Sequence, residues 1–238
     1  GHSGVEINKQ SANASKVLGR VLNALANDFD MKLSTLSGGL KDNAIPTDAE
    51  AVVIFSDTDM SDISTPGHAD IPANSAHASL QDLISKWNQI IRHECTHTDP
   101  DICITLEPVD LPAATMTDTS THTVIDVLMT YPNGVRKMSK DIAGLVQTSL
   151  NLGILSTIKP DDQSTNGMVS FKSSVRSSIG SEKDALLNSL KSLATLAGGT
   201  LTVTGDYPAW EYREDSPLRD LMVKIFKQQY GKEPVIQA

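Results

Sequence analysis

Apolar residues recur along the chain with two different periods. Helical spacing, in which one side of the segment carries an apolar stripe, predicts helices over 11–26, 79–95, 124–129, 181–197 and 216–230. Alternation with polar residues, or a compact apolar run, predicts strands over 29–33, 51–55, 102–106, 145–158, 168–177 and 201–203. A short extended stretch over residues 1–7 precedes these elements.

The order of these elements indicates the class of fold. Segments 1–107 and 108–210 each contain a pair of strands with no helix between them, which favours antiparallel over parallel pairing. We therefore expect an α+β fold in which an antiparallel sheet has helices packed on one face, built from two successive ferredoxin-like halves. Such a sheet keeps its second face free for a partner or a substrate.

The polar stretches and the tail complete this picture. The composition of residues 57–76, rich in Asp, Ser, Thr, Pro and Gly, predicts a surface loop. Ser181 is the predicted N-terminal cap of the helix over 181–197. In the tail, Ser216 and Pro217 start a helix that Gly231 ends. We interpret residues 211–238 as the start of a segment that returns to another domain, absent from this sequence.

Charge and composition argue against several functions. The 238 residues have a net charge of −9 and no cluster of Lys and Arg, so we expect no nucleic-acid partner. No apolar run approaches the roughly 20 residues that span a bilayer, so we expect no membrane partner. Two cysteines, Cys95 and Cys103, form no disulfide framework and indicate a reducing, cytoplasmic setting.

One short motif, His93-Glu94-Cys95-Thr96-His97, matches the H-E-x-x-H pattern of zinc peptidases. In those enzymes both histidines lie on one helix and bind zinc, while the glutamate activates water. Here the motif lies at the end of a predicted helix, and no downstream residue offers a convincing third ligand. We favour a chance match and keep the zincin interpretation as an alternative.

The predicted strand 168–177 places an arginine on a polar face. Apolar and polar positions alternate, with Val169, Phe171 and Val175 on one face and Ser170, Lys172, Ser174 and Arg176 on the other. Arg176 is thus either a solvated surface residue or a group that binds an anion. A guanidinium fits a carboxylate through two parallel hydrogen bonds, which a lysine cannot imitate.

Several stretches together resemble one known family. The stretches are Gly1-His2-Ser3-Gly4, Asn13-Ala14, Asp42-Asn43-Ala44-Ile45-Pro46 and Val175-Arg176-Ser177, with further similarity at 133–135, 147–151 and 205–210. They resemble the lid domain of the carnosinase-type zinc metallopeptidases, and the resemblance covers essentially the whole chain. It implies that the chain is an inactive fragment of a longer dipeptidase, with Xaa-His dipeptides as one candidate substrate.

The resemblance also implies roles for three residues. His2 would stabilise the tetrahedral intermediate, Asn43 would bind the substrate backbone, and Arg176 would bind the C-terminal carboxylate of the dipeptide. It implies two zinc ions bound by a catalytic domain of the same polypeptide, no zinc in this chain, and a homodimer. Plainer readings are a histidine at a frayed terminus and an asparagine in an ordinary turn. The competing function is a non-enzymatic dimerisation or binding module.

Overall fold

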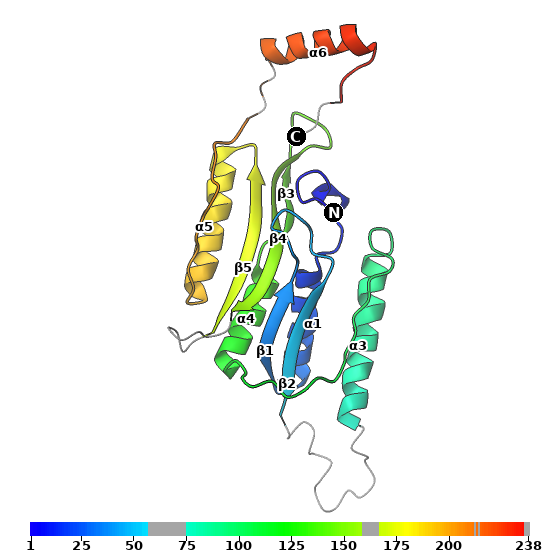
Figure 1. Ribbon diagram of the computed structural model, residues 1–238, viewed down its shortest axis with the longest axis vertical. Coiled ribbons are helices and arrows are strands. Elements are labelled where there is room, and N and C mark those ends of the chain that lie inside the picture. Colours follow the sequence, from blue (N-terminus) through cyan, green and yellow to red (C-terminus); the bar gives the residue numbers. More distant parts are fainter. Residues whose placement is uncertain (57–74, 159–166, 212, 214, 236–238) are drawn as a thin grey trace, which may run out of the picture.

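The computed structural model describes residues 1–56, 75–158, 167–211, 213 and 215–235 (Figure 1). Its elements are the 3-10 helix η1 (Ile7–Lys9), the strands β1 (Met31–Gly38), β2 (Ala49–Phe55), β3 (Gly134–Met138), β4 (Val146–Ile158) and β5 (Met168–Ser177), and the helices α1 (Ala14–Asp28), α3 (Ser75–Glu94), α4 (Asp118–Thr130), α5 (Gly180–Leu196) and α6 (Pro217–Tyr230). The predicted surface loop over 57–76 lies almost entirely outside the described residues.

The five strands form one antiparallel sheet around the long strand β4. Strand β5 pairs with β4 from Thr148 to Ile158 and therefore takes up one edge of it. Strand β1 pairs with β4 at Leu155 and Ser156, and β3 pairs with the other end of β4. Because a strand has only two edges, β1 and β3 share the second edge end to end, and β2 extends the sheet beyond β1.

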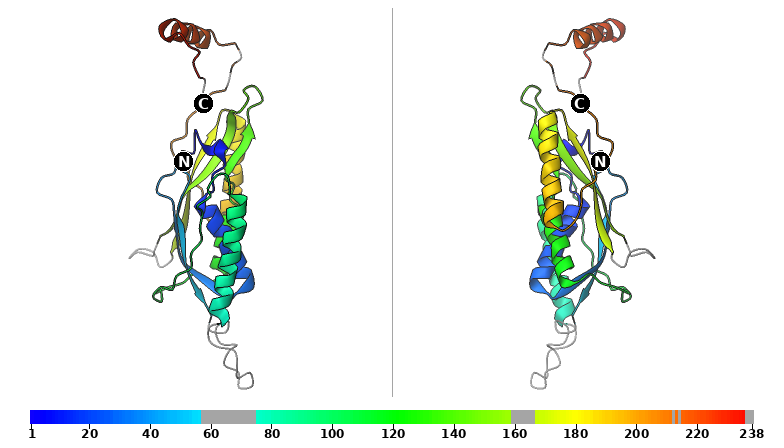
Figure 2. Two further views of the ribbon diagram at one scale, coloured as in Figure 1. Left: turned by 90° about the vertical axis from the view of Figure 1, so that its right-hand side faces the viewer. Right: turned by 90° about the vertical axis from the view of Figure 1, so that its left-hand side faces the viewer.

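Helices cover one face of this sheet. Figure 2 shows α1, α3, α4 and α5 on the same side, with the other side open. The core between the layers consists mainly of leucines, and those with 2% exposure or less are Leu22, Leu33, Leu36, Leu128, Leu150, Leu152 and Leu155. The predicted α+β fold, an antiparallel sheet with helices on one face, is therefore confirmed.

Strand β5 shows how the alternating pattern sets the two faces. The ring of Phe171 stacks on that of Tyr131 at 5.5 Å, and the Tyr131 hydroxyl forms a 2.9 Å hydrogen bond with Ser173. Tyr131 directly follows α4, so the odd-numbered residues of β5 face the helices. Successive side chains of a strand point to opposite faces, so Lys172 and Arg176 belong to the open side.

The strand predicted over 102–106 is wrong. These residues alternate in burial, but they form no ladder with any described strand. The side chain of Asn88 on α3 instead satisfies Ile104: its Nδ2 donates to the Ile104 carbonyl (2.7 Å), and its Oδ1 accepts from the Ile104 N–H (2.8 Å). The alternation thus reflects packing against a helix, because one amide side chain replaces the neighbouring strand.

Other local predictions were also wrong. Residues 201–203 are not a strand, since only Leu201 packs against the core and Val203 is 48% exposed. Helix α5 starts after Ile179 without a side-chain cap, so Ser181 lies inside it. Strand β3 was not predicted, because three of its five residues are exposed and carry no apolar pattern. The opening stretch, predicted to be extended, forms one β-bridge at His2 and leads into η1 at Ile7.

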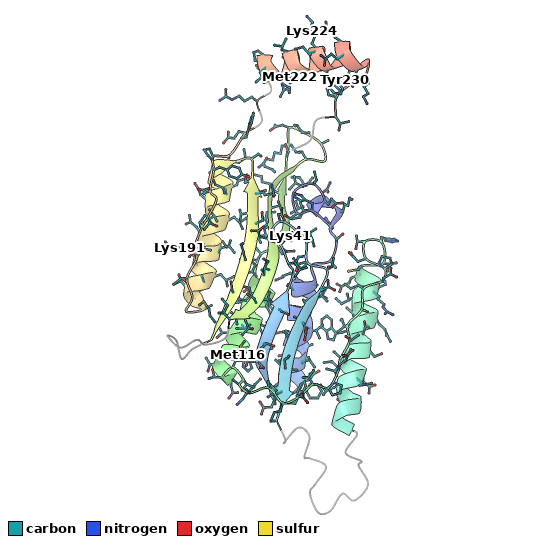
Figure 3. All side chains as sticks on the ribbon, in the orientation of Figure 1. Lys41, Met116, Lys191, Met222, Lys224 and Tyr230 are labelled. Atoms are coloured by element: carbon teal, nitrogen blue, oxygen red, sulfur yellow. The ribbon has the colours of Figure 1, made fainter. Side chains whose placement is uncertain are left out.

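Helix α6 stands apart from the sheet and its helices (Figures 1 and 3). Its predicted boundaries are confirmed, since the Ser216 side chain accepts from the N–H of Arg219 and Gly231 has a φ of 66° at the C-cap. No residue of α6 is buried, and Leu218, Leu221 and Met222 are more than half exposed.

Strands from segments 1–107 and 108–210 meet in one sheet. The division of the chain into these two segments and 211–238 stays a prediction.

Candidate functional site

The first residues of the chain lie against the connection between β1 and β2. The backbone N–H of Ser3 donates to the Asn43 carbonyl (2.9 Å), and the N–H of Ile45 donates to the Gly1 carbonyl (2.9 Å). These two bonds flank the β-bridge between His2 and Ala44. Two of the three predicted site residues, 41 positions apart in the sequence, therefore come from segments that pair directly.

The imidazole of His2 has a defined orientation. Its Nδ1 accepts from the backbone N–H of Gly4 (3.1 Å) and, more weakly, from that of Val5 (3.4 Å). In the neutral ring one nitrogen accepts and the other carries the proton, so this arrangement leaves the proton on Nε2. His2 as a whole residue is exposed.

Glu6 holds the backbone of this turn. Its carboxylate accepts from the N–H of His2 (2.8 Å) and pairs with the ammonium of Lys9 (2.6 Å). The hydrogen bond from Lys9, followed by that from His2, lowers the pKa of Glu6 to about 2. The carboxylate is therefore ionised at neutral pH and keeps both contacts.

Arg176 of β5 meets His2 at Gly4. A methyl group built on Gly4 would lie 3.0 Å from Cε1 of His2 and 3.3 Å from Cζ of Arg176, so the ring and the guanidinium flank this glycine. Any larger residue at position 4 would crowd both groups. The Nε of Arg176 is buried and has no hydrogen-bond partner among the described residues. Strand β5 thus brings the third predicted site residue to the same corner of the sheet.

Asn43 lies at the tip of the connection between β1 and β2, a region that Lys41 marks in Figure 3. Its side chain is exposed, while the neighbouring Asp42 pairs with Lys172 of β5 (3.2 Å). Asn43 and Arg176, together with Gly4, Asp42 and Lys172, are among the many residues that line one broad concavity, which extends as far as Arg219. The corner therefore brings together an imidazole, an amide and a guanidinium, and of these three residues Asn43 and Arg176 line the concavity.

Three hydrogen-bonded asparagines lie beside this corner, and the sequence did not predict their contacts. Asn13 caps α1, and its Nδ2 donates to the Leu152 carbonyl (2.9 Å) and to Oδ1 of Asn133 (3.2 Å). Asn133 Oδ1 also accepts from the Leu152 N–H (2.9 Å). Asn151, 1% exposed, donates from Nδ2 to the carbonyls of Asp42 (3.1 Å) and Ala44 (2.7 Å). The only sequence signal was that all three lie within stretches of family resemblance.

Two glycines let the backbone of the connection approach β4. A methyl group on Gly153 would lie 2.4 Å from the Asp42 carbonyl oxygen, and one on Gly39 would lie 2.0 Å from the Gly153 carbonyl oxygen. Gly39 also has a φ of 68°, which favours glycine. The pairing of β4 with β5 shifts register next to Gly153, between Leu152 and Ile154. This bulge makes room for the segment that carries Asn43.

The H-E-x-x-H motif does not form a zincin helix. Helix α3 ends at Glu94, so His93 and His97 are not presented by one continuous helix. Glu94 instead forms two hydrogen bonds with the guanidinium of Arg20 on α1 (2.6 and 2.8 Å). The described residues contain no group of three or more His, Cys, Asp or Glu that could hold a metal ion. The described residues thus do not supply a set of ligands that fits a zinc site.

Comparison with known proteins identifies the class. Residues 1–99 match the family model of the peptidase dimerisation domain. Over its whole length the chain is related to dipeptidases, and it corresponds to their lid and dimerisation domain. No helix among the described residues has the length and apolar character needed to cross a membrane.

Two relatives are similar along the entire chain. The cytosol non-specific dipeptidase of Escherichia coli (strain K12) is 31% identical over 237 residues. The crystal structure of aminoacylhistidine dipeptidase from Vibrio alginolyticus has the same fold, with a TM-score of 0.81 and 29% identity. The chain is covered completely in both comparisons but spans only 44% of the length of each relative.

Proposed function

We propose that this chain is the substrate-binding lid of a dipeptidase, with His2, Asn43 and Arg176 as the residues that contact a dipeptide. One observation carries the proposal: the His2 ring and the Arg176 guanidinium flank Gly4, while Asn43 pairs through its backbone with Ser3. A donor, an amide and a cation thus come from three segments that meet at this corner. Both dipeptidase relatives support this assignment by similarity over the whole chain.

The chemistry of each side chain fits a part of a dipeptide. The Nε2–H of His2 can donate to the oxygen that becomes negatively charged when the peptide carbonyl is attacked. The Asn43 amide both donates and accepts, as a peptide group requires. The Arg176 guanidinium can form a two-point contact with the C-terminal carboxylate.

The remainder of the reaction belongs to a part of the polypeptide outside this sequence. The two zinc ions that we expect in the enzyme need ligands that the described residues do not supply. The chain by itself should therefore neither bind zinc tightly nor hydrolyse dipeptides. Calorimetric titration with zinc and a dipeptide assay test this directly. Tight stoichiometric binding that His93→Ala abolishes would favour the zincin alternative instead.

The proposed contact between Arg176 and the C-terminal carboxylate of the dipeptide can be tested by mutation. In the full-length enzyme, Arg176→Ala should lower kcat/KM for a free dipeptide by about 10- to 1,000-fold, because a sheltered charge-assisted pair is lost. A C-terminally amidated dipeptide, which has no carboxylate, should be affected much less. Arg136→Ala is the matched control, since Arg136 is an exposed arginine on another strand, β3, and does not line the concavity. An equal loss of kcat/KM for both substrates would refute the contact between Arg176 and the carboxylate.

We also propose a homodimer located in the cytoplasm, with Xaa-His dipeptides among its substrates. The match to a peptidase dimerisation domain supports the dimer, and the names of the two relatives support the location and the substrate. Light scattering on the chain, compared with a version that ends at Trp210, tests whether the exposed apolar side of α6 takes part. A dimer without peptidase activity in the full-length protein would favour the non-enzymatic dimerisation module.

A further inference from the structure

The side chain of Asn151 binds the backbone carbonyls of the residues directly before and after Asn43. Its Nδ2 donates to the carbonyl of Asp42 (3.1 Å) and to that of Ala44 (2.7 Å). The two bonds fix the backbone before and after the exposed asparagine. Asn151 itself is 1% exposed on the central strand β4, and its Oδ1 lies 3.5 Å from the Nδ2 of Asn13. An exposed side chain is therefore anchored through its backbone to a buried amide.

We propose that Asn151 is a positioning residue that sets the orientation of Asn43 toward the substrate. The inference rests on the proposed function, in which Asn43 contacts the substrate backbone. A hairpin connection with an exposed tip has many accessible backbone conformations, and ordering it upon binding would reduce affinity. Asn151 orders it in advance, because both of its donor hydrogens are used on this segment.

The test is a double-mutant cycle on kcat/KM of the full-length enzyme. Asn43→Ala alone tests whether Asn43 contacts substrate at all. Asn151→Ala should lower kcat/KM by about 10- to 100-fold, the range expected when a binding group is misplaced by roughly 1 Å. If Asn151 acts only through Asn43, adding Asn151→Ala to Asn43→Ala should cause almost no further loss. A general structural defect would instead multiply the two losses.

Asn133→Ala provides the matched control. Asn133 belongs to the same asparagine network, but its side chain bonds to Asn13 and Leu152 and not to the connection that carries Asn43. Its replacement should lower thermal stability as Asn151→Ala does, while kcat/KM stays within about threefold of the parent value. The comparison separates loss of a buried amide from loss of the contact with the connection.

Gly153→Ala disturbs the same contact from the other side and keeps Asn151 intact. Its methyl group would lie 2.4 Å from the Asp42 carbonyl oxygen, so the connection must move away. When it is added to Asn43→Ala, this variant should also cause almost no further loss of kcat/KM. It therefore tests the positioning role even if Asn151→Ala does not fold. Circular dichroism verifies that each variant is folded.

The outcomes are distinguishable. Near-complete non-additivity with Asn43→Ala, and a small effect of Asn133→Ala, supports the positioning role. Additive losses, or an Asn133→Ala loss as large as that of Asn151→Ala, overturn it and leave the proposed role of Asn43 standing. An Asn43→Ala variant with unchanged kcat/KM refutes the role of Asn43 and the positioning role together.

Discussion

The corner around Asn43 and helix α6 are ordered in opposite ways. The corner has little regular secondary structure, yet buried amides, two closely approached glycines and backbone pairing hold it. Helix α6 is regular and capped at both ends, yet none of its residues is buried. A short helix gains little stability from propensity alone, whereas tertiary contacts can order a segment of any local conformation. Regular structure and tight anchoring are thus separate properties in this chain.

Replacing one leucine in the core and one in α6 should show the largest difference in stability between the two regions. Leu150 of β4 is fully buried, whereas Leu221 of α6 is 53% exposed. Leu150→Ala should lower the free energy of unfolding by about 2–5 kcal/mol, because it leaves a cavity in the core. Leu221→Ala should change it by about 0.5 kcal/mol or less. Urea unfolding of both variants gives the two values, and equal costs would show that α6 is packed against a partner in solution.

Two helix caps sharpen the same comparison. Asn13 caps α1 and Ser216 caps α6, each accepting from a backbone N–H three residues on. Only Asn13 also bonds to buried groups of β4, through the Leu152 carbonyl. Asn13→Ala should therefore cost about 2–4 kcal/mol of global stability, from the lost cap and the unsatisfied carbonyl. Ser216→Ala should cost about 1 kcal/mol or less and only reduce the helicity of the tail.

Circular dichroism and hydrogen exchange measure these two effects. Global protection should fall in Asn13→Ala, while exchange in Ser216→Ala should accelerate only within α6. Loss of protection in the sheet upon Ser216→Ala would contradict the view that α6 is ordered separately.

The smallest expected effect appears only in acid. Glu182 joins α5 to the sheet by accepting from Lys137, Thr148 and Gln147, and these bonds, that from Lys137 first, lower its pKa to about 2. A carboxyl group whose pKa is lower in the folded than in the unfolded protein stabilises the folded state at pH values above its ordinary pKa of 4.5. This stabilisation is lost as the pH falls from 4.5 toward 2. Glu182→Gln should thus be less stable than the parent at pH 6, with the difference disappearing near pH 2.

Asp184→Asn is the control for this experiment, because Asp184 lies on the same helix and is exposed. Urea unfolding at several pH values between 2 and 6 provides the comparison. A stability difference for Glu182→Gln that does not depend on pH would show that the carboxylate charge is unimportant there.

The sequence alone determined the features that depend on nearest neighbours and on periodicity. The stripe of α1, the apolar face of β5 and the caps of α6 are local signals, and the structure confirms all three, with Val169, Phe171 and Val175 packed against the core. The position of Arg176 on the open face followed from alternation alone. Resemblance selected His2 and Asn43, because neither residue has a local signature that separates it from a terminal histidine or a turn asparagine.

Only the tertiary structure decided the rest, because it depends on pairs of residues far apart in the chain. The apolar pattern of 102–106 is that of a strand, but Asn88 replaces the missing neighbour, and no periodicity reports this. His2 and Arg176 meet at Gly4, and Asn151 bonds to the connection between β1 and β2. Both arrangements need contacts between residues more than 100 positions apart in the chain. A sequence pattern records burial and backbone period, whereas these contacts depend on which segments the folded sheet brings together.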